Sequence, residues 1–113
     1  MKSVLRLRRS TDFARVRRQG IVHKNRWMQL TYAKNDLSYN RYGFVTSKKL
    51  GGAVVRNRAK RQLREATYRL HPQLHQGYDI VIIVRPAFVG QPFLQILRIQ
   101  SELYRQAQLI KEN

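Results

Sequence analysis

Residues 43–66 read GFVTSKKLGGAVVRNRAKRQLREA, a stretch that joins a predicted strand to a predicted helix. The strand covers residues 42–47, and the KKLGG that follows it reads as a loop. On a helical wheel the next segment has one narrow apolar arc, formed by Val55, Ala59, Leu63, Ala66 and Leu70. Because such an arc must pack on other apolar surface, the stretch predicts a helix lying on a sheet.

Three more segments have the pattern of strands. Residues 21–24 and 27–33 are short runs of strand type, and a turn at residues 34–41 (KNDLSYNR) follows them. Residues 78–85 (YDIVIIVR) are apolar almost throughout, as expected of a strand that is buried on both faces.

Two further helices complete the predicted fold. The first follows Ser10, a residue that can cap it, and ends at Gly20. The last runs from residue 93 to about residue 110, with apolar residues at helical spacing. The order α-β-β-β-α-β-α predicts an α/β (α+β) two-layer sandwich with a four-stranded mixed sheet, in one domain over residues 1–113.

The central helix carries more positive charge than a fold requires. Residues 56–65 hold five cations and a single acid, Glu65. The arc beside the apolar stripe contains Arg56, Asn57, Lys60, Arg61 and Arg64. Arg58 lies on the far flank. Cations one turn apart repel each other, so folding gains nothing from this arrangement. A solvated helix face is the plainer explanation, but such faces mix both signs; we therefore predict a polyanionic partner.

Charge over the whole chain points to nucleic acid. The 113 residues include 23 Lys and Arg but 6 Asp and Glu, a net charge of +17 at pH 7. Of the 23 cations, 19 lie in residues 1–69 and 16 are Arg, whose planar fork fits phosphate and stacks on bases. A basic membrane-surface protein is the alternative, but no segment clearly forms an amphipathic helix with exposed aromatic or Leu residues.

The sequence also argues against several other classes of protein and of functional site. Cys is absent, which excludes disulfides, thiolate metal sites and a thiol nucleophile. No apolar run reaches the roughly 18 residues of a membrane span. The N-terminal MKSVLRLRRSTDF lacks the apolar core of a secretory signal. We therefore expect a cytoplasmic protein with no membrane partner.

The loop before the central helix offers a second group of phosphate-binding residues. Lys48 and Lys49 precede Gly51 and Gly52, at a helix N-terminus whose unpaired N–H groups favour an anion. The glycines alone are equally typical of a flexible turn, and it is the two lysines that favour phosphate contact. The spacing is not that of a P-loop, so nucleotide hydrolysis and a small-molecule substrate are not expected.

The side chains that a protein nuclease needs are not gathered in any segment. Such enzymes usually cluster carboxylates around two metals or use a pair of His residues. The six acids are scattered, at Asp12, Asp36, Glu65, Asp79, Glu102 and Glu112. His71 and His75 flank Pro72, which disfavours a shared metal site on a helix, and His23 stands alone in a strand. We predict no catalytic residue and no metal site in the protein itself.

Residues 43–66 resemble the protein component of bacterial ribonuclease P. That family carries an Arg-Asn-Arg motif followed by Lys-Arg and a further Arg, and preceded by a Ser-Lys-Lys-Leu/Ile-Gly segment. The matching positions are Lys48, Arg56, Asn57, Arg58, Lys60, Arg61 and Arg64. The likeness extends to RLRRSTDFARVRRQG near the start and to GYDIVIIVRP later, and so spans nearly the whole chain.

The resemblance implies a ribonucleoprotein with one protein per catalytic RNA. In that family the RNA hydrolyses the bond that releases the 5′ leader of precursor tRNA, with magnesium bound mainly by RNA. The basic protein would bind this RNA through the Arg-Asn-Arg helix and the loop before it. The resemblance also implies a left-handed crossover between parallel strands, against the usual right-handed rule. A structural RNA-binding protein, such as a ribosomal protein of similar fold, is the alternative.

The family also holds the precursor tRNA leader in a cleft between the first helix and the sheet. Phe13 matches the first aromatic residue of that cleft, although a Phe in a short helix can equally serve the core. Arg17 replaces a second aromatic residue, and it can stack through its guanidinium or pair with phosphate. On the second strand, one of two alternating sets of residues should line the cleft. Trp27 and Tyr32, one from each set, are the candidates.

Overall fold

The computed structural model describes residues 5–112; residues 1–4, which begin the basic N-terminal segment, and residue 113 lie outside the described part. The elements are α1 (Ser10–Gln19), β1 (Ile21–Lys24), β2 (Met28–Lys34), β3 (Arg41–Val45), η2 (Lys48–Leu50), α2 (Ala53–Leu70), η3 (His71–Gln73), β4 (Tyr78–Val84), η4 (Pro86–Phe88) and α3 (Phe93–Gln106), where η marks a short 3₁₀ helix. The predicted order of helices and strands is confirmed. Within the described part, no helix is long and apolar enough to cross a membrane.

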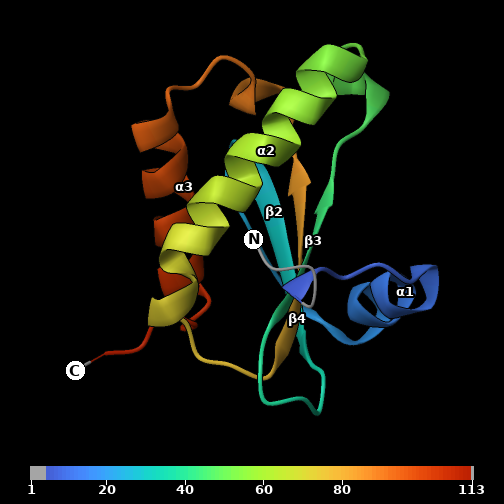
Figure 1. Ribbon diagram of the computed structural model, residues 1–113, viewed down its shortest axis with the longest axis vertical. Helices are drawn as coiled ribbons and strands as arrows, with labels where there is room; N and C mark the ends of the chain where they lie inside the picture. Colours follow the sequence, from blue (N-terminus) through green and yellow to red (C-terminus); the bar gives the residue numbers. More distant parts are fainter. Residues whose placement is uncertain (1–4, 113) are drawn as a thin grey trace.

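The four strands form one mixed sheet in the order β1-β2-β4-β3. β2 pairs antiparallel with β1 and β4, and β3 pairs parallel with β4, with Phe44 opposite Ile82. In Figure 1, β3 and β4 both run upward, α2 crosses in front of them, and β4 lies to the left of β3. The β3–α2–β4 crossover is therefore left-handed, as the family resemblance implied and against the usual rule.

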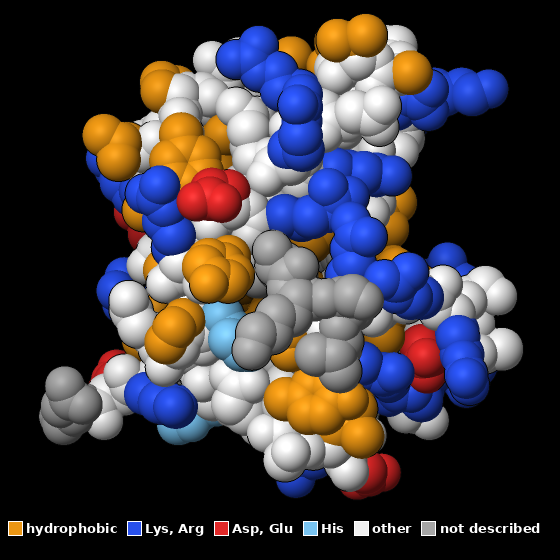
Figure 2. Space-filling model, viewed as in Figure 1, with side chains coloured by type: hydrophobic (Ala, Val, Ile, Leu, Met, Phe, Trp, Pro, Cys, Tyr) orange, Lys and Arg blue, Asp and Glu red, His pale blue; other side chains and the backbone are white. Residues whose placement is uncertain are grey.

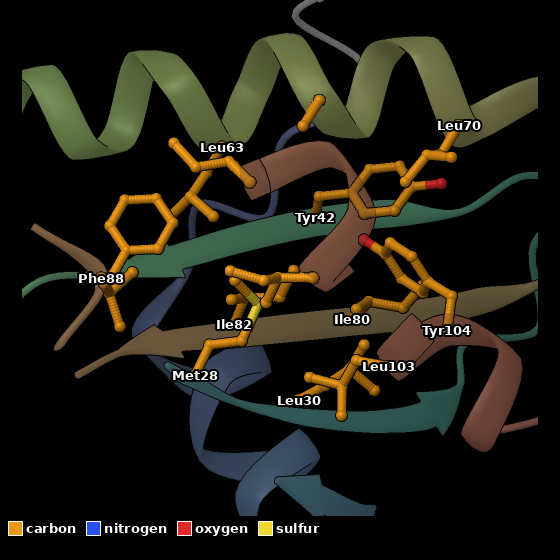
Figure 3. Packing of buried hydrophobic residues seen from close by; sticks show 14 of the residues in the cluster. Met28, Leu30, Tyr42, Leu63, Leu70, Ile80, Ile82, Phe88, Leu103 and Tyr104 are labelled. Carbon is orange, nitrogen blue, oxygen red and sulfur yellow. The ribbon is translucent and has the colours of Figure 1, made fainter. Parts of the chain in front are cut away.

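The main core lies between the sheet and the helices α2 and α3, which cover one of its faces (Figures 1 and 3). α2 buries Ala59, Leu63, Ala66 and Leu70 there, which confirms the central part of the predicted apolar stripe. Their partners include Met28, Leu30, Tyr42, Ile80, Ile82, Phe88, Ile96, Ile99, Leu103 and Tyr104. Because one arc of α2 packs on this core, the polar arcs of the helix face solvent.

α1 covers only part of the other face of the sheet. A second, smaller buried cluster lies there, made of Leu7, Val16, Ala33 and Val81. Phe13 packs against this cluster from α1. Further along the same face the sheet stays open, because Ile83 is 36% exposed and Val45 is 37% exposed. β4 is thus buried on both faces, as predicted, except at Ile83, which is exposed, and at Tyr78, which is half-buried.

Asp79 of β4 ties α1 to this face. Its fully buried carboxylate accepts hydrogen bonds from Arg15 of α1 and from Nε and Nη2 of Arg41, the latter two at 2.9 and 2.8 Å. Nδ2 of Asn35 donates a further bond of 2.9 Å. Hydrogen bonding to Asp79 raises the pKa of Arg41. Because a buried carboxylate is tolerated only when it is paired, Asp79 restricts where α1 can lie.

The ends of α1 and α3 differ from the prediction. Ser10 does not cap α1: the carbonyl of Arg9 already accepts a hydrogen bond from N of Phe13 at 3.2 Å, which places Ser10 inside the helix. Gly20 ends the helix as predicted. α3 stops before residue 110, because Gln108 has a φ of +61° and turns the chain out of the helix.

Candidate nucleic-acid interface

One side of α2 presents cations without acidic partners. The cationic face, as we name it, consists of Arg56, Asn57, Lys60, Arg61 and Arg64. None of its four cations forms an ion pair with an acid within residues 5–112. Glu65, the single acid of the helix, pairs with Arg69 at 3.3 Å. Figure 2 shows Lys and Arg side chains gathered beside α2 and onward to α1. Charges that the fold leaves unpaired are available to a polyanion.

The two arginines of the Arg-Asn-Arg motif point to different sides of α2. Residues two apart lie about 160° apart around an α-helix, so Arg56 and Arg58 cannot both face one flat surface. Arg58 is exposed, and it lines a small pocket with Gln62 and Phe88. Arg56 is half-buried, and its shielded Nε has no hydrogen-bond partner among the described residues. A partner that contacts both arginines must therefore reach two sides of α2.

A groove of about 250 Å³ lies where α2, β3 and the segment before α1 meet. This α1 groove is lined chiefly by Arg6, Phe13, Gly43, Phe44, Lys60 and Arg64. Burial lowers the pKa of Arg64, and the charge of Arg6 lowers it further. Two like charges held together favour an anion between them. The α1 groove is thus suited to a phosphate beside an aromatic ring.

The α1 groove and the cationic face are one continuous surface. Lys60 and Arg64 line the groove. They also line a depression on α2, together with Asn57 and Arg61 of the cationic face. On the α1 side, the ring of Phe13 lies over Gly43, where a Cβ would come within 2.4 Å of Cζ of the ring. Phe13 therefore has room only because position 43 is glycine.

The loop before α2 adds exposed cations at the N-terminus of that helix. Lys48 and Lys49 are exposed in η2, and Oγ of Ser47 accepts a hydrogen bond from N of Lys49 at 3.3 Å. Gly51 has a φ of +140°, in a region that favours glycine. A Cβ at Gly52, the residue before the first turn of α2, would meet no described atom within 4 Å. The helix N-terminus is therefore open to an anion.

Trp27 and Tyr32 do not lie with Phe13. Both are half-buried and pack against the main core, whereas Phe13 packs against the cluster on the other face. Tyr32 stacks on His23, with the ring centroids 6.1 Å apart. Alternation along β2 turns Tyr32 to the same side as Leu30, and Trp27 lies just before the first residue of that strand. Neither of the two candidates therefore lies on the side of the sheet against which Phe13 packs.

The other alternating set of β2, which contains Gln29 and Thr31, faces α1. Thr31 is opposite Val81, a member of the smaller cluster, and its Cγ2 lies beside Gly20 at the end of α1. Arg17 is exposed on α1, one turn after Phe13, and forms no ion pair with an acid of the described residues. α1 therefore presents one half-buried ring, Phe13, and one exposed guanidinium, Arg17, while the strand residues on the side of α1 include the polar Gln29 and Thr31.

The acids do not assemble into a metal site. Within residues 5–112, no group of three His, Asp or Glu side chains comes together. Asp12 and Asp79 do approach each other, but Arg15 and Arg41 lie between them and pair with both. These carboxylates are therefore committed to holding α1 on the sheet.

Three comparisons with known proteins agree on the family. The family model described as Ribonuclease P matches residues 1–108. The ribonuclease P protein components of Chloroflexus aurantiacus and Roseiflexus castenholzii are 43% and 39% identical to this chain, over 97% and 98% of its length and 82% and 92% of theirs. The solved RNase P proteins of Staphylococcus aureus and Thermotoga maritima match with TM-scores of 0.87 and 0.80, at 29% and 31% identity; the matches cover 95% and 88% of this chain and 98% and 96% of those. The chain belongs to the ribonuclease P protein family.

Two features of this ribonuclease P family protein were missed from the sequence. Arg6 begins the RLRRSTDFARVRRQG segment but was given no role, and only the fold brings it beside Arg64. Gly43 did carry a signal, since a glycine inside a predicted strand often marks a close approach of another group. That signal would have located the contact between Phe13 and β3.

Proposed function

We propose that this chain is the protein subunit of a ribonuclease P ribonucleoprotein and binds the catalytic RNA through the cationic face, together with Lys48, Lys49 and Arg58. The observation that carries the proposal is the set of α2 cations that have no acidic partner within residues 5–112. Phosphates of a folded RNA would supply the missing countercharge, and the Arg fork suits their geometry. The open N-terminus of α2 would add backbone donors to the same surface.

The α1 groove would hold the 5′ leader of precursor tRNA. A single strand needs flat side chains for its bases and cations for its phosphates. In the groove, Phe13 offers the ring, and Arg6 and Arg64 offer an anion site. Arg17, exposed one turn after Phe13 on α1, would add a guanidinium plane outside the groove. Because Lys60 and Arg64 belong to both surfaces, the leader and the catalytic RNA would lie side by side on the protein.

The RNA, and not the protein, would hydrolyse the phosphodiester bond. The carboxylates of Asp12 and Asp79 are held by arginines and do not offer the paired acids of a protein nuclease. Magnesium would be bound mainly by RNA phosphates, whose mutual repulsion the positive charge of the protein lessens. We further infer a cytoplasmic assembly with one protein per RNA.

A structural RNA-binding protein, such as a ribosomal protein of similar fold, is the second candidate from the sequence. Positive charge and an α/β sandwich suit both functions equally well. The family match over residues 1–108 favours the ribonuclease P subunit.

Reconstitution tests the proposal. The chain is combined with a bacterial ribonuclease P RNA at low magnesium, and cleavage of precursor tRNA is followed. We expect the protein to lower the magnesium concentration at which the RNA cleaves. A combined Arg61→Ala and Arg64→Ala variant should lose this effect, and Arg98→Ala, on the outside of α3, should keep it. Equal binding to unrelated structured RNAs, with no gain in cleavage, would favour the structural alternative.

A further inference from the structure

A small pocket lies beside α2, away from the cationic face. This η4 pocket has a volume of about 170 Å³ and is lined by Val54, Arg58, Gln62, Phe88, Val89 and Gly90, among others. Its walls are apolar apart from the guanidinium of Arg58 and the amide of Gln62. Neither the α1 groove nor the depression of the cationic face includes Arg58.

The rim of the η4 pocket is apolar and open to solvent. Val54, in the first turn of α2, is 81% exposed, and Val89 is 42% exposed. Gly90 has a φ of +86°, and a Cβ there would meet no described atom within 4 Å. The pocket is therefore accessible from outside, and its apolar rim would gain from contact with a flat apolar group.

Arg58 indicates which kind of flat apolar group the η4 pocket would bind. Its side chain is exposed and forms no ion pair with an acid of the described residues. A guanidinium beside an apolar wall can stack on a nucleobase and bind the phosphate next to it. The amide of Gln62 can both donate and accept hydrogen bonds along a base edge. An unstacked nucleotide can contact all three parts of the pocket wall. Its base can lie on the apolar side chains and bond to the amide of Gln62, and its phosphate can pair with Arg58.

The η4 pocket also adjoins the surface assigned to the catalytic RNA. Val54 lines both this pocket and the depression that contains Asn57, Lys60, Arg61 and Arg64. An RNA strand on the cationic face therefore reaches the mouth of the pocket by crossing one exposed valine. This continuity, together with the charge of Arg58, selects RNA over a protein partner.

We propose that the η4 pocket takes up one unpaired base of the catalytic RNA while the flanking backbone stays on the cationic face. The inference rests on the proposed function and adds a base-binding site to it. The RNA would then contact α2 on two sides. Arg58 would contact the inserted base and its phosphate, and Arg56 would contact the backbone on the cationic face. Phosphate contacts alone would not fix the position of the protein along an RNA helix, whereas one inserted base would.

Site-specific cross-linking tests the inference directly. The chain has no Cys, so Val89→Cys can carry a single photoreactive group at the rim of the pocket. Leu37→Cys is the matched control, because Leu37 is 37% exposed. It belongs to the turn between β2 and β3, and this turn lies at the opposite end of the molecule from the segment that follows β4 (Figure 1). In the complex with a bacterial ribonuclease P RNA, we expect the probe at position 89 to label one unpaired base and the probe at position 37 to label none. Labelling of protein alone, or of paired bases only, would overturn the inference.

Affinity provides a second measurement. Val89→Asp and Leu37→Asp add the same charge at similarly exposed positions. Losing one stacked base should weaken RNA binding by Val89→Asp roughly 5- to 100-fold, while Leu37→Asp stays near wild type. Equal affinities of the two variants would overturn the η4 pocket and leave the proposed function standing. Failure of the wild-type chain to bind the RNA would instead remove the proposed function itself.

Discussion

The ring of Phe13 in α1 lies directly against Gly43 of β3. A Cβ placed on Gly43 would come within 2.4 Å of Cζ and 2.5 Å of Cε1 of the ring. Side chains do not approach a Cβ so closely, so either the ring or α1 would have to move. The shape of the α1 groove, which Phe13 and Gly43 both line, therefore depends on this one glycine.

Gly43→Ala should displace Phe13 and disturb the leader site. Overpacking of this kind typically costs ~1–3 kcal/mol, which urea unfolding would measure. Precursor tRNA binding by the reconstituted complex should weaken, and assembly with the catalytic RNA should change little. Ser38→Ala, at an exposed position in the turn between β2 and β3, is the control. If the two variants behave alike, the close contact at Gly43 has no functional role.

Arg61→Ala should weaken assembly with the catalytic RNA and leave the fold intact. Arg61 is exposed on the cationic face and has no acidic partner among the described residues. Loss of one phosphate contact should reduce the slope of log affinity against log salt by about 1. Arg98→Ala, which removes an exposed cation paired with Glu102 on α3, should leave that slope unchanged. An unaltered slope for Arg61→Ala would remove this residue from the RNA interface.

The architecture of the main core could be predicted because its signal is local. Ala59, Leu63, Ala66 and Leu70 repeat at helical spacing, and burial in the structure follows that repeat. The crossover hand could not be predicted from such patterns, since periodicity says which face is buried but not on which side of β3 the chain returns. Only the family resemblance supplied it.

The candidate site was predicted unevenly for a similar reason. The cationic face lies within one helix, so a helical wheel was enough to find it. The neighbourhood of Phe13 is assembled from segments far apart in the chain. Asp79 pairs with Arg15, 64 residues away, and with Arg41, 38 residues away. The sequence of the apolar strand that contains Asp79 does not indicate these partners. For Trp27 and Tyr32, strand alternation separated two sets of residues but could not say which set faces α1, since that depends on how the sheet packs.

Leu63→Ala should unfold the protein more easily without touching the RNA interface. Leu63 is fully buried at the centre of the α2 stripe, so the change leaves a cavity between helix and sheet (Figure 3). Such changes cost ~2–5 kcal/mol. Urea unfolding would measure the loss, with Leu94→Ala as control because Leu94 is 76% exposed. Equal stability of the two variants would mean that the helix is rotated relative to the packing described.

Stability should fall when the solution is acidified through the titration of His71. Oη of Tyr42 and Nδ1 of His71 lie 2.7 Å apart, and burial lowers the pKa of His71 below its ordinary value of 6.5, with a smaller effect from Lys111. The folded state therefore favours neutral His71, and the unfolded chain binds the proton more readily. The stabilisation is present above pH 6.5 and is lost as pH falls through the folded-state pKa.

Urea unfolding on both sides of pH 6.5 checks this expectation. The free energy of unfolding should fall less steeply for His71→Gln than for the wild type as the pH is lowered. His75→Gln, at an exposed position, is the control and should follow the wild type. If all three proteins lose stability in parallel, another group controls the acid response.

The combined Phe13→Ala and Arg17→Ala variant should lose discrimination between precursor and mature tRNA. Both residues lie on α1 at the proposed leader site, so they would contact the precursor only. Loss of one stacked base and one exposed charge contact suggests an effect of roughly 1–4 kcal/mol on precursor binding. Mature tRNA binding and assembly with the catalytic RNA should barely change. The leader-dependent affinity should also fall with salt, by about 0.7 log units per log unit of salt for each phosphate contacted.

A matched double variant on α3 separates the leader site from general effects of losing a ring and a cation. Phe93→Ala with Arg98→Ala also removes one half-buried phenylalanine and one exposed arginine, but from the helix that packs on the other face of the sheet. Reconstituted complexes of wild type and both double variants are titrated with precursor and mature tRNA. We expect the two affinities to converge for the α1 variant alone. Because Phe13 and Arg17 would touch only the leader, equal losses for both tRNAs would place them outside its path.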